Sequence, residues 1–129
     1  MSGAPPSPEG EPAIRVIAMP ADTNPNGDIF GGWLMAQMDL AGASAAQRRA
    51  HGRVATVAVD SMSFHLPVKV GDEVSIYARI VGTGRSSLRV FVEAWRRMRA
   101  AEARDRVTSA TFVFVAIDES GRPRPIDPP

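Results

Sequence analysis

The chain has 129 residues, 15 basic and 14 acidic side chains, a formal net charge of +1 and no cysteine. This length suits one domain, and the lack of cysteine excludes disulfides, thiolate metal sites and a cysteine nucleophile. The near-neutral charge argues against nonspecific nucleic-acid binding, and no apolar run approaches the length of a membrane span.

The first half of the chain predicts one short strand and one long helix. Proline-rich ends predict flexible tails at residues 1–12 and 127–129, which leaves one domain at residues 13–126. A strand at residues 14–19 should stop at Pro20, and turn-forming residues follow as far as Gly27. Apolar and small residues at helical spacing predict a helix from Gly31 to about Ala50, which His51 and Gly52 should end.

The second half of the chain predicts strands only. Residues 54–66 form a β-rich stretch whose apolar phase changes, which predicts a bulge near Asp60 and Ser61. Strict alternation then predicts three further strands, around residues 74–80, 88–94 and 110–116. One helix cannot supply the crossovers of a parallel sheet, so we expect an α+β fold with an antiparallel sheet curled around the helix. The last strand is apolar on both faces, which suggests that another subunit covers its outer face.

The predicted start of the helix is the first candidate for chemistry. Gly31 and Gly32 would leave open backbone N–H groups at a helix N-terminus, where a developing oxyanion is stabilised. The alternative is that the two glycines only permit a tight turn or close packing.

Asp39 is the second candidate, because aspartate is unfavourable within a mostly apolar helix. It could serve as a general base, or it could be a solvated residue or an ion-pair partner of Arg15 or Arg53. Gly32 and Asp39 are two helical turns apart on one face, about 10 Å along the axis at ~1.5 Å per residue. Since one helix cannot easily bring both groups to one carbonyl, a site shared between two antiparallel helices of a dimer is expected.

The third candidate is the turn Gly84-Arg85-Ser86-Ser87, whose backbone, guanidinium and hydroxyls could hold a phosphate. The alternative is an ordinary hairpin loop. A nucleophile system built on His65 is disfavoured, because neighbouring strand residues point to opposite faces. The arginine-rich residues 96–106 are interpreted as a solvated hairpin end.

Several segments of the chain form a recognisable set. They are Met19-Pro20-Ala21-Asp22-Thr23-Asn24, Gly27-Asp28-Ile29-Phe30-Gly31-Gly32-Trp33, Gln37-Met38-Asp39, His51-Gly52-Arg53-Val54, Thr56–Met62, Val70-Gly71-Asp72, Gly84–Ser87 and Gly121–Pro125. Together these segments closely resemble the bacterial acyl-CoA thioesterases of the YciA type. The resemblance extends over residues 14–126 and implies the hotdog fold, in homodimers that commonly assemble as trimers of dimers.

The resemblance also implies roles for individual residues. Asp39 corresponds to the catalytic carboxylate, and Gly32 to the backbone donor that polarises the thioester carbonyl. The residues expected to contact substrate or CoA are Asn26, Asp28, Gly31, Thr56, Gly84, Arg85, Ser86 and Ser87. Asp28 stands where related thioesterases carry asparagine, and a carboxylate differs from an amide in charge and in donors.

The expected function is therefore hydrolysis of acyl-CoA to a carboxylic acid and CoA, over a broad range of acyl chains. Asp39 would act as base or nucleophile, with no metal or redox cofactor, and a cytoplasmic location is expected. The alternative is a noncatalytic hotdog module that binds acyl-CoA as a sensor or regulatory subunit. A hotdog dehydratase fits less well, because it would need a catalytic histidine at the helix start.

Overall fold

The computed structural model describes residue 8 and residues 10–128. Most of the predicted N-terminal tail and the last residue of the predicted C-terminal tail lie outside this range. The elements in chain order are β1 (Ile14–Ile17), a 3-10 helix (Pro20–Asp22), α1 (Gly31–Ala50), β2 (Val54–Val59), β3 (Glu73–Thr83), β4 (Ser87–Arg97) and β5 (Asp105–Ala116).

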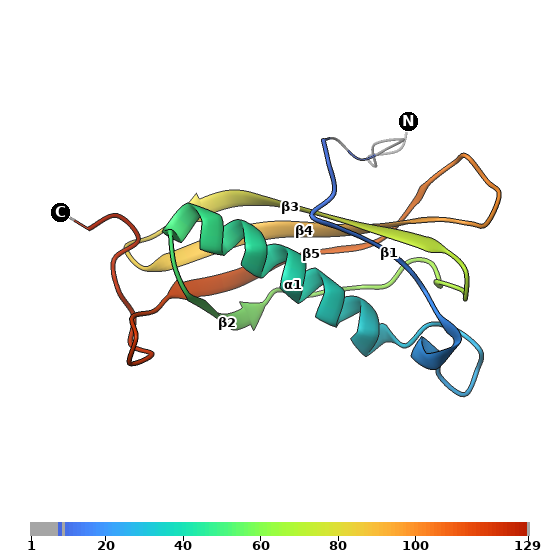
Figure 1. The fold of residues 1–129 in the computed structure, drawn as a ribbon, viewed down its shortest axis with the longest axis horizontal. Helices are drawn as coiled ribbons and strands as arrows, with labels where there is room; N and C mark the ends of the chain where they lie inside the picture. The colour runs from blue at the N-terminus through green and yellow to red at the C-terminus, as the bar shows by residue number, and fades with distance from the viewer. Residues whose placement is uncertain (1–7, 9, 129) are drawn as a thin grey trace.

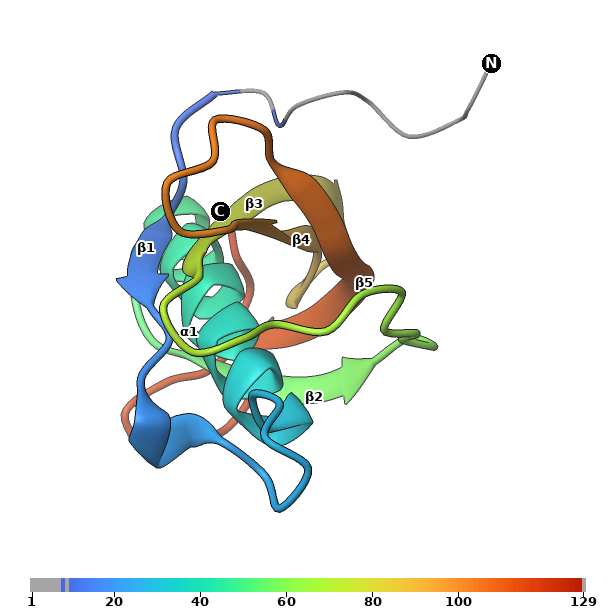
Figure 2. The same ribbon diagram turned by 90° about the vertical axis from the view of Figure 1, so that its right-hand side faces the viewer.

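The five strands form one sheet in the order β1-β3-β4-β5-β2, and every pairing is antiparallel. Figures 1 and 2 show the sheet curling around the single helix α1, so that β1 and β2 lie at its two edges. The predicted class, one helix wrapped by a curved antiparallel sheet, is confirmed.

Helix α1 packs one face into the curve of the sheet and ends as predicted, at Ala50. The residues that it buries are mostly small: Leu34, Met38, Ala41, Gly42, Ala46 and Ala50. Gly42 lies so close to the sheet that a Cβ atom there would come within 3.0 Å of Phe114 Cζ and 3.2 Å of Val92 Cγ2. After Ala50, His51 adopts a left-handed conformation with φ of 54°, which ends the helix.

Strand β2 differs from its prediction. It ends at Val59, so the expected strand through residue 66 is wrong, and its register shift falls between Thr56 and Ala58 instead of near Asp60 and Ser61. Beyond β2 the chain still follows β5 through isolated bonds, from Asp60 N to Thr111 O at 2.9 Å and from His65 N to Val107 O at 2.9 Å. Apolar residues continue along this segment without a continuous ladder, which explains the wrong boundary.

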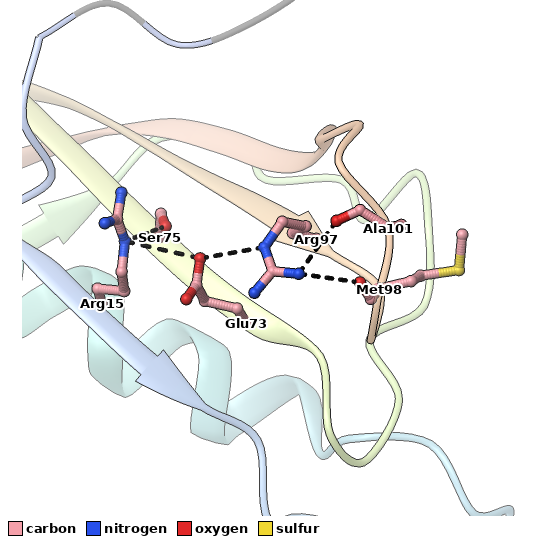
Figure 3. Close-up of polar contacts among 6 residues, drawn as sticks. All are labelled: Arg15, Glu73, Ser75, Arg97, Met98 and Ala101. Carbon is pink, nitrogen blue, oxygen red and sulfur yellow. Dashed lines mark hydrogen bonds and ion pairs between the residues drawn. The ribbon is translucent and has the colours of Figure 1, made fainter.

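A carboxylate between two arginines ties the strands together near the β4–β5 loop (Figure 3). Glu73 Oε1 of β3 lies 3.7 Å from Arg15 Nε of β1 and 3.5 Å from Arg97 Nε of β4. Arg15 Nε also donates to Ser75 Oγ at 3.2 Å, and Arg97 Nη1 donates to the carbonyl of Ala101 at 3.0 Å. Arg97 therefore anchors the loop and is a structural member of the arginine-rich segment.

Within the described part of the chain, no helix is both long and apolar enough to span a membrane.

Candidate active site

The structure brings Asp39 and Thr56 together. Thr56 Oγ1, on the edge strand β2, donates a hydrogen bond of 2.7 Å to Asp39 Oδ1, on α1. Neither of the arginines considered as partners pairs with Asp39: Arg15 binds Glu73, and Arg53 donates to the carbonyls of the turn after β5. The Asp39 carboxylate is therefore held by a neutral hydroxyl and not by either of these arginines.

The first turn of α1 presents unused backbone donors. The N–H groups of Trp33 and Leu34 bond to the carbonyl of Phe30, at 3.0 and 3.3 Å, whereas those of Gly31 and Gly32 have no acceptor among the described residues. Both glycines are exposed. Neither has a positive φ, so no left-handed turn conformation requires glycine at these positions.

An exposed aromatic ring approaches Gly32 more closely than Gly31. A Cβ atom on Gly32 would come within 2.9 Å of Cε2 of the Phe30 ring, whereas one on Gly31 would touch Phe64 at an ordinary 3.8 Å. Phe30 and Phe64 are both about half exposed. The open N–H groups thus lie beside exposed aromatic rings, an arrangement suited to a carbonyl that carries an apolar chain.

The loop before α1 is built by Asn24. Its side-chain Oδ1 accepts from the N–H groups of Asn26, at 2.9 Å, and Asp28, at 3.2 Å, and Gly27 supplies the positive φ of 84°. The Asp28 carboxylate forms an ion pair with Lys69 Nζ. The Asn26 side chain is exposed and has no bonded partner among the described residues.

The sequence analysis missed the pairing of Lys69 with Asp28. The available signal was that Lys69 is the only lysine among fifteen basic residues. This pair, with the bond from Ile29 N to Val68 O at 2.9 Å, fastens the loop before α1 to the segment before β3.

The turn Gly84–Ser87 joins β3 to β4 at the opposite end of α1 from Gly31 and Gly32 (Figure 1). Gly84 N donates to Ser87 O at 2.8 Å, which closes the turn. The side chains of Arg85, Ser86 and Ser87 form no hydrogen bond or ion pair within the described part of the chain. Within one chain, then, Asp39 meets Thr56, while the predicted CoA turn lies apart from the helix start.

Comparison with known proteins identifies the family. Residues 26–103 match the family model described as Thioesterase superfamily. The acyl-CoA thioester hydrolase YciA of Salmonella typhimurium is 52% identical over 123 residues, which cover 93% of this chain and 92% of that protein.

Two solved structures share the architecture. The hexameric thioesterase y2039 from Yersinia pestis is 51% identical, with a TM-score of 0.89 over 95% of this chain and 100% of the other. HI0827, described as a hexameric broad specificity acyl-coenzyme A thioesterase, is 50% identical, with a TM-score of 0.87 over 95% of this chain and 84% of the other. These matches extend over most of the sequence, and the chain belongs to the Thioesterase superfamily, with a hotdog fold.

Proposed function

We propose that this protein is an acyl-CoA thioesterase that hydrolyses acyl-CoA to a carboxylic acid and CoA, over a broad range of acyl chains. The observation that carries the proposal is the Asp39 carboxylate, which lies on α1 and is oriented by the hydroxyl of Thr56 on β2. The first turn of the same helix presents the unused N–H groups of Gly31 and Gly32. These are the two components that thioester hydrolysis needs, an activating carboxylate and an oxyanion donor. The extensive identity to acyl-CoA thioester hydrolases supports the same substrate class.

The reaction needs no metal or redox cofactor. The Gly32 N–H polarises the thioester carbonyl and stabilises the negative charge that forms on its oxygen. Asp39 either removes a proton from the attacking water or attacks the carbonyl carbon itself, and water then releases the acid. In both routes the C–S bond breaks, and the CoA sulfur leaves and is protonated. Both routes use the same carboxylate.

The site is proposed to form between two subunits. Gly32 and Asp39 lie seven residues apart on α1, about 10 Å along its axis at ~1.5 Å per residue, so one helix cannot easily bring both groups to one carbonyl. Exposed apolar side chains on the helix and on the edge strand β2 support an interface there, namely Met35, Leu40, Val57 and Val59. The assembly proposed is a homodimer at least, and a trimer of dimers by analogy with the hexameric relatives.

Substrate contacts are proposed for residues at two places, near the reacting carbonyl and at the turn between β3 and β4. They are Asn26, Asp28, Gly31 and Thr56 near the reacting carbonyl, and Gly84, Arg85, Ser86 and Ser87 at the CoA moiety. The proposal includes a cytoplasmic location, which fits a chain without cysteine.

The test is release of free thiol from a panel of acyl-CoAs of increasing chain length, followed with a thiol-reactive dye. The protein adds no thiol signal of its own, because it has no cysteine. We expect rapid release by the wild type and almost none by Asp39→Ala, with CoA binding retained. Binding without release by the folded wild type would instead support the noncatalytic module. A fully active monomer in light scattering would contradict the shared site.

A further inference from the structure

The segment after β5 turns back across one end of the molecule. Asp118 begins a turn, Ile117 and Pro123 form an isolated bridge, and Arg124 N donates to the carbonyl of Ala116 at 2.9 Å. Figure 1 shows that this C-terminal segment, the last turn of α1 and the turn between β3 and β4 gather at the same end. The segment therefore connects the helix end with the turn proposed to contact CoA.

Arg124 is the centre of this connection. Its guanidinium donates to three backbone carbonyls: Ala50 at 2.8 Å, Ile117 at 3.3 Å and Pro125 at 3.0 Å. Ala50 is the last residue of α1, where carbonyl groups lack helical partners and the helix dipole favours a cation. Gly52 leaves space for the arginine, since a Cβ atom there would come within 2.6 Å of Arg124 Nη2.

Two residues later the same segment binds the backbone of the β3–β4 turn. Ile126 is buried, and its N–H donates to the carbonyl of Arg85 at 2.8 Å. The neighbouring carbonyl of Ser86 accepts from Ala116 N, also at 2.8 Å. The backbone of the turn is thus fixed, while its arginine and serine side chains remain unengaged within the described chain.

A notch of about 430 Å³ lies between this turn and the C-terminal segment. It is lined by Gly84, Arg85, Pro125 and Asp127, so the two segments form its opposite walls. Asp127 is held by Arg49 through two bonds of 2.9 Å, and this arginine lowers the pKa of the Asp127 carboxyl. The C-terminal wall of the notch is therefore bound to α1 through Arg49, and the Asp127 carboxylate is already paired with this cation.

We propose that Arg124 is a positioning residue for the nucleotide end of CoA. By binding Ala50 and Pro125 it fixes the C-terminal segment, and Ile126 in turn holds the Gly84–Ser87 turn in the shape that receives phosphate. A phosphate site made of a turn, a guanidinium and hydroxyls depends on such a preorganised backbone. This inference rests on the proposed acyl-CoA thioesterase function.

The test compares a full substrate with one that lacks the nucleotide. Arg124→Ala is assayed on an acyl-CoA and on the N-acetylcysteamine thioester of the same acid. We expect the KM for acyl-CoA to rise about tenfold with kcat nearly unchanged, and kcat/KM for the short thioester to match the wild type. Arg124→Lys keeps the charge but cannot reach three carbonyls, so its KM for acyl-CoA should lie between those of the wild type and Arg124→Ala. This variant keeps the test possible if Arg124→Ala does not fold.

Arg122→Ala is the matched control, because it removes the same charge two residues away and Arg122 forms hydrogen bonds only through its backbone N–H and carbonyl within the described chain. Arg122→Ala should leave kcat and KM unchanged for both substrates. An equal loss on both substrates in the Arg124 variants, or an unchanged KM for acyl-CoA, would overturn the inference. Failure of the wild type to hydrolyse acyl-CoA would instead overturn the proposed function, so the two failures are distinguishable.

Discussion

Replacing Thr56 by valine tests whether its hydroxyl orients the Asp39 carboxylate. Valine keeps the β-branched shape that suits strand β2 and removes the donor of the 2.7 Å bond. A hydrogen bond to a charged group contributes about 1.5–3 kcal/mol. Because Thr56 is exposed and Asp39 half-buried, water competes for the carboxylate, and the lower end of about 1.5 kcal/mol applies.

Since about 1.4 kcal/mol corresponds to a factor of ten in rate, Thr56→Val should lower kcat about tenfold. The assay is steady-state thiol release over a range of acyl-CoA concentrations, which separates kcat from KM. Thr56→Ser is the control, because it keeps the hydroxyl and should retain most of the wild-type kcat. Wild-type turnover in Thr56→Val would refute the orienting role, and an equal loss in Thr56→Val and Thr56→Ser would show that loss of the hydroxyl does not explain the effect.

Three further predictions concern stability. Gly42→Ala should destabilise the fold by about 1 kcal/mol, because crowding against Phe114 (about 1–3 kcal/mol) outweighs the gain in helix propensity (about 1 kcal/mol), and an unchanged urea midpoint would contradict it. Phe114→Ala should cost about 3–5 kcal/mol in the same urea titration, since this ring is fully buried, and a loss under about 1 kcal/mol would show that the core collapses around the gap. The hydrogen bond from the Arg122 N–H lowers the pKa of the Asp118 carboxyl. The ionised Asp118 therefore stabilises the fold above the ordinary aspartate pKa, and this stability is lost as the pH falls through the folded-state pKa. An NMR titration should place the Asp118 pKa below that of exposed aspartates, and Asp118→Asn should remove its share of the acid dependence; an ordinary Asp118 pKa would contradict this.

The local sequence pattern predicts those elements whose ends are marked by glycine or other turn-forming residues. The double glycine before Trp33 and the pair His51-Gly52 mark both ends of α1, and the structure agrees with both. Alternation predicts β3, β4 and β5 because one face of each strand packs against the helix. The end of β2 was not predictable in this way, since residues 60–66 keep apolar side chains but form only isolated bonds to β5.

Sequence patterns select candidate residues for the site but do not predict their contacts. Asp39 and Gly32 stand out as residue types that are unusual at their helical positions, and the resemblance to known thioesterases assigns their roles. The bond between Asp39 and Thr56 depends on how β2 docks against α1, which no local pattern encodes. The three carbonyl contacts of Arg124 likewise join residues up to 74 positions apart.

The ion pair between Lys69 and Asp28 involves the one lysine of the sequence. Arginine does not react with amine-directed reagents as lysine does, so Lys69 is the one side-chain target that such a reagent has in this sequence. It lies against the loop that leads into Gly31 and Gly32. The Lys69 side chain is more than half exposed, so the rate of labelling at Lys69 reports how firmly the Asp28 carboxylate holds its ammonium. Because a label on the amine removes the ammonium that pairs with Asp28, the labelled protein tests what this ion pair contributes to holding the loop before α1.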